Sequence, residues 1–319
     1  IAPSLVGSEM CIRDRPMHRN LGVFTSRNVD LEKLFSQLMN KKGGFTKGRD
    51  RSFHFGELKY NIVGMISHLA AMLPVANGFA YGFQLDNKKR VAVAFVGDGA
   101  TSEGDFHEAL NHAAVWNLPV LFIIENNGFG LSTPVEQQYK CKDLIDKAKG
   151  SGSLGNIVDG NNIEDVFKST QLAVKHIQKG KGPFLIEAKT FRIRGHEEAS
   201  GTKYVSKELI DYWAKKDPIV QLENYLLKEN WINQKNIDDL KKSLLSEIQP
   251  ILDRVSLKSK DSSTAEIELN DVYADSFYQI KKPSKNSDTK RYIDAIQEGL
   301  YQKMESVSYT HLTLPTNTV

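Results

Sequence analysis

Two polar turns in this sequence combine the residue types that bind a divalent cation and a phosphate. The first is Gly97-Asp98-Gly99, which directly follows an apolar run, and the second is Asn126-Asn127-Gly128, which follows another apolar run after Glu125. The carboxylate of Asp98 and the amide oxygen of Asn127 are hard oxygen ligands that suit Mg²⁺, which completes its octahedron with phosphate oxygens and water. A glycine turn also lets the backbone approach a ligand closely. Together the two turns predict a site for Mg²⁺ and a diphosphate.

A strand-helix-strand unit is expected to bring the two turns together. The apolar runs Val91–Val96 and Leu118–Ile124 have the length and composition of buried strands. Between them we expect a helix capped by Ser102, with Asp105 in a capping-box position and an N-terminus that favours an anion. Its apolar face consists of Phe106, Ala109, Leu110 and Ala113. Because the carboxyl ends of parallel strands meet at one edge of a sheet, the two turns should lie side by side.

Other interpretations of the two turns stay open at this point. Either turn alone is more often an ordinary tight turn than a binding site. A nicotinamide-binding Rossmann domain is less well supported, because Gly97-Asp98-Gly99 lacks a third glycine at the expected offset. An acid inside that turn would also repel a pyrophosphate unless a metal ion intervened.

The longer text GDGATSEGDFHEALNHAAVWNLPVLFIIENNGFGLSTP resembles a known family. It is similar to the alpha subunits of the thiamine-diphosphate-dependent 2-oxo acid dehydrogenases, the decarboxylating first components of the pyruvate and branched-chain complexes. The similarity covers about residues 16–305. It implies a doubly wound, mostly parallel α/β sheet with helices on both faces and a helical C-terminal appendage. A further helix over Ile163–Gln178 and a strand over Pro183–Thr190 favour the same sheet.

The resemblance also implies which residues bind thiamine diphosphate and Mg²⁺. Arg19 would grip the diphosphate, Leu69 would bend the cofactor, and His196 would be the catalytic residue. The cofactor-binding set is Arg19, Ser67, Leu69, Gly97, Asp98, Gly99, Ala100, Asn127 and His196, and the metal ligands are Asp98, Asn127 and Phe129. Branched-chain enzymes hold a potassium ion with hydroxyl and amide residues where this chain has Ala71 and Met72, so retention of that ion is left open.

Composition excludes several classes of function. The chain is 40% hydrophobic and 25% charged, with a formal net charge of +3, which argues for neither nucleic acid nor membrane as a partner. No apolar run approaches the length of a membrane span. Only Cys11 and Cys141 are present. They imply no disulfide framework, and we expect a reducing, cytoplasmic location.

The pattern along the chain suggests several boundaries. Residues 1–15 and 306–319 resemble translated adaptor sequence and are interpreted as non-native tails, with a natural disordered terminus as the alternative. Residues 16–275 form the expected alpha-subunit domain, in which 61–83 is a helix rich in small residues, suited to a subunit interface. Its segment 206–255 is a helical appendage, with Pro218 and Pro250 as starts or breaks. Residues 276–290 are an expected linker, and 291–305 resemble the start of a beta subunit.

The resemblance finally implies an activity and its partners. The favoured activity is oxidative decarboxylation of a branched-chain 2-oxo acid of the 3-methyl-2-oxobutanoate type, with acyl transfer to a lipoyl group. The expected partners are a beta subunit or domain that supplies an activating glutamate, and the lipoyl domain of a dihydrolipoyl acyltransferase, in an α2β2-like assembly. The chain would then be the alpha part of a fused alpha-beta dehydrogenase, inactive by itself.

Three alternatives to the branched-chain activity remain. A pyruvate or acetoin dehydrogenase alpha subunit is favoured by Glu125, where branched-chain enzymes often have arginine. A cofactor-less interaction subunit is the second. A transketolase-like enzyme is the third, although the SEGDFHEALN helix and Gly195-His196 argue against it.

Overall fold

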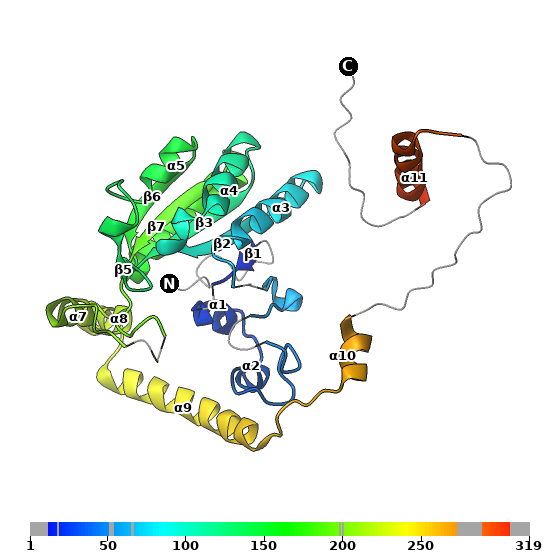
Figure 1. The fold of residues 1–319 in the computed structure, drawn as a ribbon. Helices are drawn as coiled ribbons and strands as arrows, with labels where there is room; N and C mark the ends of the chain where they lie inside the picture. Colours follow the sequence, from blue (N-terminus) through cyan, green and yellow to red (C-terminus); the bar gives the residue numbers. More distant parts are fainter. Residues whose placement is uncertain are drawn as a thin grey trace. The chain divides into compact units, whose positions relative to one another are not determined.

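Five parallel strands form a sheet in the order β1-β2-β3-β7-β6 (Figure 1). They are β1 (Ile12–Arg15), β2 (Val91–Gly97), β3 (Val120–Asn126), β6 (Leu154–Asp159) and β7 (Phe184–Lys189). The computed structural model describes residues 12–17, 19–50, 54–64, 67–197, 199, 201–272 and 289–306. The chain divides into two units, Ile1–Ser262 and Ser263–Val319, and the sheet belongs to the first.

Helices cover both faces of the sheet, as predicted. Successive residues of a strand point to opposite faces. The even-numbered residues from Ala92 to Val96 therefore pack against α3 (Met72–Leu85), α4 (Gly104–Val115) and α5 (Asp146–Gly150). The odd-numbered residues from Val91 to Phe95 pack in a second core with α1 (Leu21–Ser26), α2 (Leu31–Leu38) and α6 (Ile163–Gln178). Burial on both faces explains why this strand is continuously apolar.

The cap predicted for α4 is wrong, although the helix and its buried face are confirmed. Ser102 lies in a 3₁₀ turn, η3 (Gly99–Ser102), and α4 begins after Glu103 with no side-chain cap. The turn forms because Thr101 bonds back to the carbonyl of Asp98, with its backbone N–H at 3.1 Å and its hydroxyl at 2.7 Å. The chain directly after β2 is therefore tighter than an α-helix.

The helix expected over residues 61–83 is also shorter than predicted, since α3 begins only at Met72. The preceding backbone is held in another conformation. Gly64 packs on the backbone of Gly56, where a Cβ added to Gly56 would lie 2.3 Å from the nitrogen of Gly64. Ala70 has a φ of +61°, which an α-helix does not accommodate. The described part of 61–71 is therefore a loop.

The expected boundary at residue 15 does not coincide with a boundary of the fold, because β1 pairs with β2 from Ile12 to Arg15. Arg15 in this strand is fully buried, and its guanidinium nitrogens have no hydrogen-bond partner among the described residues. Its guanidinium carbon lies 3.8 Å from the ring centre of Phe79. Burial and the charge of Arg13 lower the pKa of Arg15 to about 10. A buried, unpaired arginine is a costly strand residue.

The helical appendage is confirmed as α7 (Lys207–Ala214), α8 (Pro218–Lys228) and α9 (Gln234–Leu257). Pro218 starts α8 as expected, but Pro250 lies inside α9 and neither starts nor ends a helix. Lys258 directly after α9 pairs with Glu32 of α2 at 2.8 Å.

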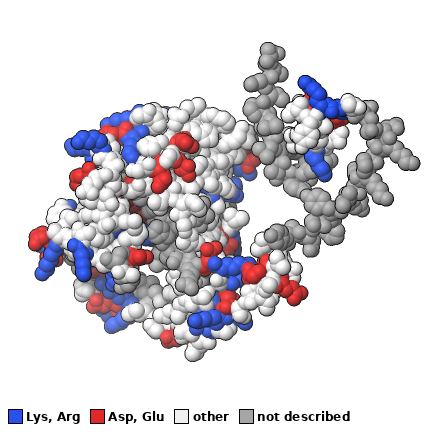
Figure 2. Space-filling view, in the orientation of Figure 1, with Lys and Arg blue, Asp and Glu red and all other residues white. Residues whose placement is uncertain are grey.

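Acidic and basic side chains are interspersed over the visible face (Figure 2). No helix among the described residues is long and apolar enough to cross a membrane.

The second unit contains α10 (Ala265–Val272) and α11 (Tyr292–Ser306). The helix α11 covers the segment that resembles the start of a beta subunit. Most of the expected linker 276–290 and of the expected tail 306–319 lies outside the described residues.

Candidate functional site

A cavity of about 460 Å³ lies at the carboxyl ends of β2 and β3. All the site residues predicted from the sequence line it: Arg19, Ser67, Leu69, Gly97, Asp98, Gly99, Ala100, Asn127, Phe129 and His196. They come from five stretches of chain that are separate in sequence. The parallel sheet brings them together because both polar turns leave it at the same edge. Their chemical roles stay predictions.

Asp98 is the most distinctive group in this cavity. It is 1% exposed, and its Oδ2 has no hydrogen-bond partner among the described residues. Burial raises the pKa of Asp98, although backbone N–H groups, including that of Asn127, and the charge of Arg192 act in the opposite direction. A buried carboxylate oxygen without a partner is unfavourable unless a cation binds it. This orphaned oxygen fits a metal ligand.

The second turn supplies two further oxygens of the right type. The Oδ1 of Asn127 accepts the backbone N–H of Phe129 at 3.2 Å, which fixes the amide over the turn. Phe129 begins β4 (Phe129–Gly130), which pairs with β5 (Thr133–Pro134), and its only oxygen is the backbone carbonyl. Within the described ranges no three His, Cys, Asp or Glu side chains cluster as a metal site. One carboxylate with amide and carbonyl oxygens suits Mg²⁺ that is shared with a phosphate.

The two glycines of the first turn have different surroundings. A Cβ added to Gly97 would meet no atom within 4 Å, so this glycine leaves open space at the cavity wall. A Cβ on Gly99 would lie 2.8 Å from the Cα of Gly130, so this glycine is needed for close packing of the two turns. Gly97 thus leaves its backbone accessible to a ligand, whereas Gly99 allows the first turn to pack closely against Gly130.

Arg19 and His196 are joined across the cavity. One nitrogen of the Arg19 guanidinium donates to the backbone carbonyl of His196 at 2.5 Å and lies 3.1 Å from its Nδ1. Partial burial, Arg19 and Arg192 lower the pKa of His196. Because arginine can only donate, Nδ1 acts as an acceptor and the neutral imidazole carries its proton on Nε2.

Ser67 and Leu69 line another part of the cavity wall. The hydroxyl of Ser67 lies 2.6 Å from Nε2 of His54. Leu69 is 55% exposed, although it is a large apolar side chain. An exposed leucine at a cavity wall can pack against the apolar part of a ligand.

Sequence reasoning missed Arg192 as a site residue. Its guanidinium lies 3.4 Å from Nδ1 of His196 and donates to the hydroxyl of Tyr204 at 2.8 Å and to the carbonyl of Leu131 at 2.6 Å. The only signal was the arginine-rich text FRIR after a strand, which does not distinguish Arg192 from Arg194.

Glu125 lines the same cavity, and its Oε1 accepts the amide of Asn20 at 2.6 Å. Burial raises the pKa of Glu125, and the hydrogen bond from Asn20 opposes that shift. The cavity therefore contains two carboxyl groups with raised pKa values, Glu125 and Asp98, together with the guanidinium groups of Arg19 and Arg192. Such a mixture fits a site that binds a metal ion and an anion together.

Comparison with known proteins agrees with this geometry. A family model described as dehydrogenase E1 component matches residues 5–263. The alpha subunit of acetoin:2,6-dichlorophenolindophenol oxidoreductase from Bacillus subtilis is 37% identical over 218 residues, 68% of this chain and 66% of the relative. The 2-oxoisovalerate dehydrogenase subunit alpha 2 of Arabidopsis thaliana is 34% identical over 261 residues, 81% of this chain and 55% of the relative.

The 2-oxoisovalerate dehydrogenase subunit alpha of Homo sapiens is 32% identical over 268 residues, 83% of this chain and 60% of the relative. The chain thus spans between about half and two thirds of the length of these relatives.

Proposed function

The chain belongs to the dehydrogenase E1 component family, and from this premise we propose that it is the alpha part of a thiamine-diphosphate- and Mg²⁺-dependent 2-oxo acid dehydrogenase. The observation that carries the proposal is the buried Asp98, one oxygen of which has no hydrogen-bond partner in the described part of the chain, at a cavity that Asn127 and Phe129 also line. We propose these three residues as the metal ligands, through carboxylate, amide and carbonyl oxygens.

The other lining residues then divide by chemistry. The guanidinium of Arg19 would bind the diphosphate, and Gly97 would let it approach the backbone near Ala100. Gly99 would border the site by holding the turn against Gly130. Ser67 and Leu69 would border the aromatic rings. When bound, thiamine diphosphate supplies the carbanion chemistry that 2-oxo acid decarboxylation requires. The protein contributes binding and orientation.

His196 is proposed to act at the reacting end of the site. Its Nδ1 faces the N–H groups of Arg19 and Arg192, so Nε2–H remains as the donor. The same two positive charges, after burial, hold the imidazole neutral near pH 7. The Nε2–H of a neutral imidazole can stabilise a developing negative charge on the substrate by donating a hydrogen bond to it.

For the substrate we propose a branched-chain 2-oxo acid of the 3-methyl-2-oxobutanoate type, with acyl transfer to a lipoyl group of an acyltransferase. Two relatives are alpha subunits of 2-oxoisovalerate dehydrogenases, which supports this choice. Acetoin or pyruvate is the second candidate. It is supported by the acetoin-oxidising relative and by Glu125 in the cavity wall.

We further propose that a beta subunit or beta domain supplies the activating glutamate, in an α2β2-like assembly located in the cytoplasm. The isolated chain is then inactive but able to bind its cofactor. Calorimetry of thiamine diphosphate with and without Mg²⁺ tests the binding, with Asp98→Ala as the variant. Heat of binding in the wild type but not in Asp98→Ala supports the proposal, and the absence of heat in the wild type contradicts it.

Kinetics of the complete alpha-beta protein test the choice of substrate. We expect 3-methyl-2-oxobutanoate to give the higher kcat/KM, and a clear preference for pyruvate or acetoin would replace the branched-chain assignment.

A further inference from the structure

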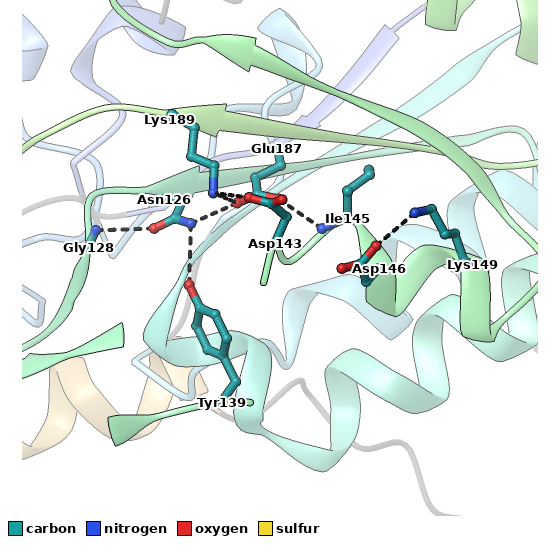
Figure 3. A network of polar contacts seen from close by, with 9 residues as sticks. All are labelled: Asn126, Gly128, Tyr139, Asp143, Ile145, Asp146, Lys149, Glu187 and Lys189. Carbon is teal, nitrogen blue, oxygen red and sulfur yellow. Dashed lines mark hydrogen bonds and ion pairs between the residues drawn. The ribbon is translucent and has the colours of Figure 1, made fainter. Parts of the chain in front are cut away.

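A fully buried carboxylate that does not line the cavity stands behind the second turn. Glu187 on β7 is 0% exposed and makes three contacts (Figure 3). Its Oε1 accepts the amide N–H of Asn126 at 2.8 Å and pairs with the ammonium of Lys189 at 2.6 Å. Its Oε2 accepts the backbone N–H of Ile145 at 2.8 Å. Both oxygens of this buried charge therefore have partners.

The contact to Asn126 fixes the shape of the turn that carries Asn127. The amide of Asn126 donates to Glu187 on one side, and its Oδ1 accepts the backbone N–H of Gly128 at 3.1 Å on the other (Figure 3). The carbonyl of Asn126 also accepts the N–H of Thr190 at 2.9 Å, just beyond β7. The side chain of Asn126 thus spans from the sheet to the turn.

The remaining contacts extend the network to a third segment. Lys189 also pairs with Asp143 at 2.9 Å, and Ile145 directly precedes α5. The hydroxyl of Tyr139 lies 3.4 Å from the amide of Asn126 (Figure 3). The carboxylate of Glu187 therefore connects the turn at 126–129 to residues 139–145, directly at Ile145 and indirectly through Asn126 and Lys189.

Stability alone gives little reason for a charge at this position. The rest of β7 is apolar from Phe184 to Ala188, and an apolar side chain of similar volume often stabilises a core as well as a buried ion pair does. A buried, fully bonded polar network instead specifies one geometry for the segments that it joins. Here one of those segments presents the oxygens of Asn127 and Phe129.

We propose that Glu187 is a positioning residue for the Mg²⁺-diphosphate site: through Asn126 it fixes the turn that presents Asn127 and the carbonyl of Phe129, and through Ile145 it couples this turn to residues 139–145. The coupling to the metal rests on the proposed function. Outer partners of metal ligands commonly contribute about 10- to 100-fold to metal affinity.

Two variants of the full chain test this role. Glu187→Gln keeps the shape but has only one acceptor oxygen for Asn126 and Ile145. Glu187→Met keeps the volume and leaves Lys189 paired with Asp143, so it remains informative if the Gln variant does not fold. The control is Asp14→Asn, which removes another buried carboxylate of the sheet, 1% exposed and paired with Arg27 at 2.7 Å.

The first measurement is hydrogen exchange without any ligand. We expect the Gly128 amide to exchange at least tenfold faster in both Glu187 variants and to be unchanged in Asp14→Asn. Unchanged exchange at Gly128 overturns the proposal, whether or not the protein binds a cofactor.

The second measurement is the Mg²⁺ concentration that half-saturates thiamine diphosphate binding. We expect it to rise about 10- to 100-fold in the Glu187 variants, with the affinity at saturating Mg²⁺ nearly unchanged. Faster exchange with an unaltered Mg²⁺ requirement would overturn the link to the metal. If the wild type binds no thiamine diphosphate, the proposed function fails, and the exchange result alone decides whether Glu187 positions the turn.

Discussion

Replacing Asp98 by asparagine should make the protein more stable and unable to bind its cofactor. The side chain is 1% exposed, and one carboxylate oxygen lacks a partner among the described residues. A buried polar group without a partner costs about 1–3 kcal/mol, and a charged one costs more. Asparagine keeps the shape without the charge, so without ligand the free energy of unfolding should rise by about 1–2 kcal/mol.

Urea unfolding with and without Mg²⁺-thiamine diphosphate measures both effects. A ligand at 100 times its Kd stabilises a protein by about 2.7 kcal/mol, and we expect this gain in the wild type but not in Asp98→Asn. The control is Asp86→Asn, at a side chain that is 56% exposed, which should change stability by less than about 0.5 kcal/mol and keep the ligand gain. A less stable Asp98→Asn, or one that the ligand still stabilises, would refute the reasoning.

Three further predictions address the glycines, the first strand and the histidine. Gly97→Ala should weaken thiamine diphosphate binding and leave the Tm at its wild-type value, whereas Gly99→Ala should lower the Tm because its Cβ would lie 2.8 Å from the Cα of Gly130. A lowered Tm in Gly97→Ala, with weakened binding and an unchanged Tm in Gly99→Ala, would contradict the assignment of Gly97 as the glycine that the ligand approaches. Arg15→Met should raise the free energy of unfolding by about 1–3 kcal/mol in urea titration, and a loss would mean that the buried guanidinium has a partner. The lowered pKa of His196 means that the unfolded chain binds more protons just below pH 6.5, so stability should fall as the pH drops through that window. His196→Asn should reduce this slope to the share contributed by His107, whose pKa is also lowered by burial and by Lys147. An unchanged slope would show that His196 does not contribute to it.

Local signals in the sequence were reliable where the chain itself supplies the hydrogen bond or the buried face. The predicted apolar face of α4, which contains Phe106 and Leu110, is buried, and Pro218 opens α8. They failed where backbone contacts made outside the expected helix intervene. The loop before Met72 is held by Gly56, and Ser102 is drawn into a 3₁₀ turn by Asp98.

The sequence by itself determined the alternating strands and helices, the two polar turns and the presence of oxygen-bearing side chains at Asp98 and Asn127, because periodicity and side-chain type are properties of short segments. Only the tertiary structure decided that Arg192 lines the cavity while Arg194 is exposed, since their side chains are alike and their spacing is uninformative. The same holds for Glu187. Its role depends on Asn126, which comes within hydrogen-bond distance when β3 and β7 pair, and on Ile145, which the segment before α5 brings to the same carboxylate.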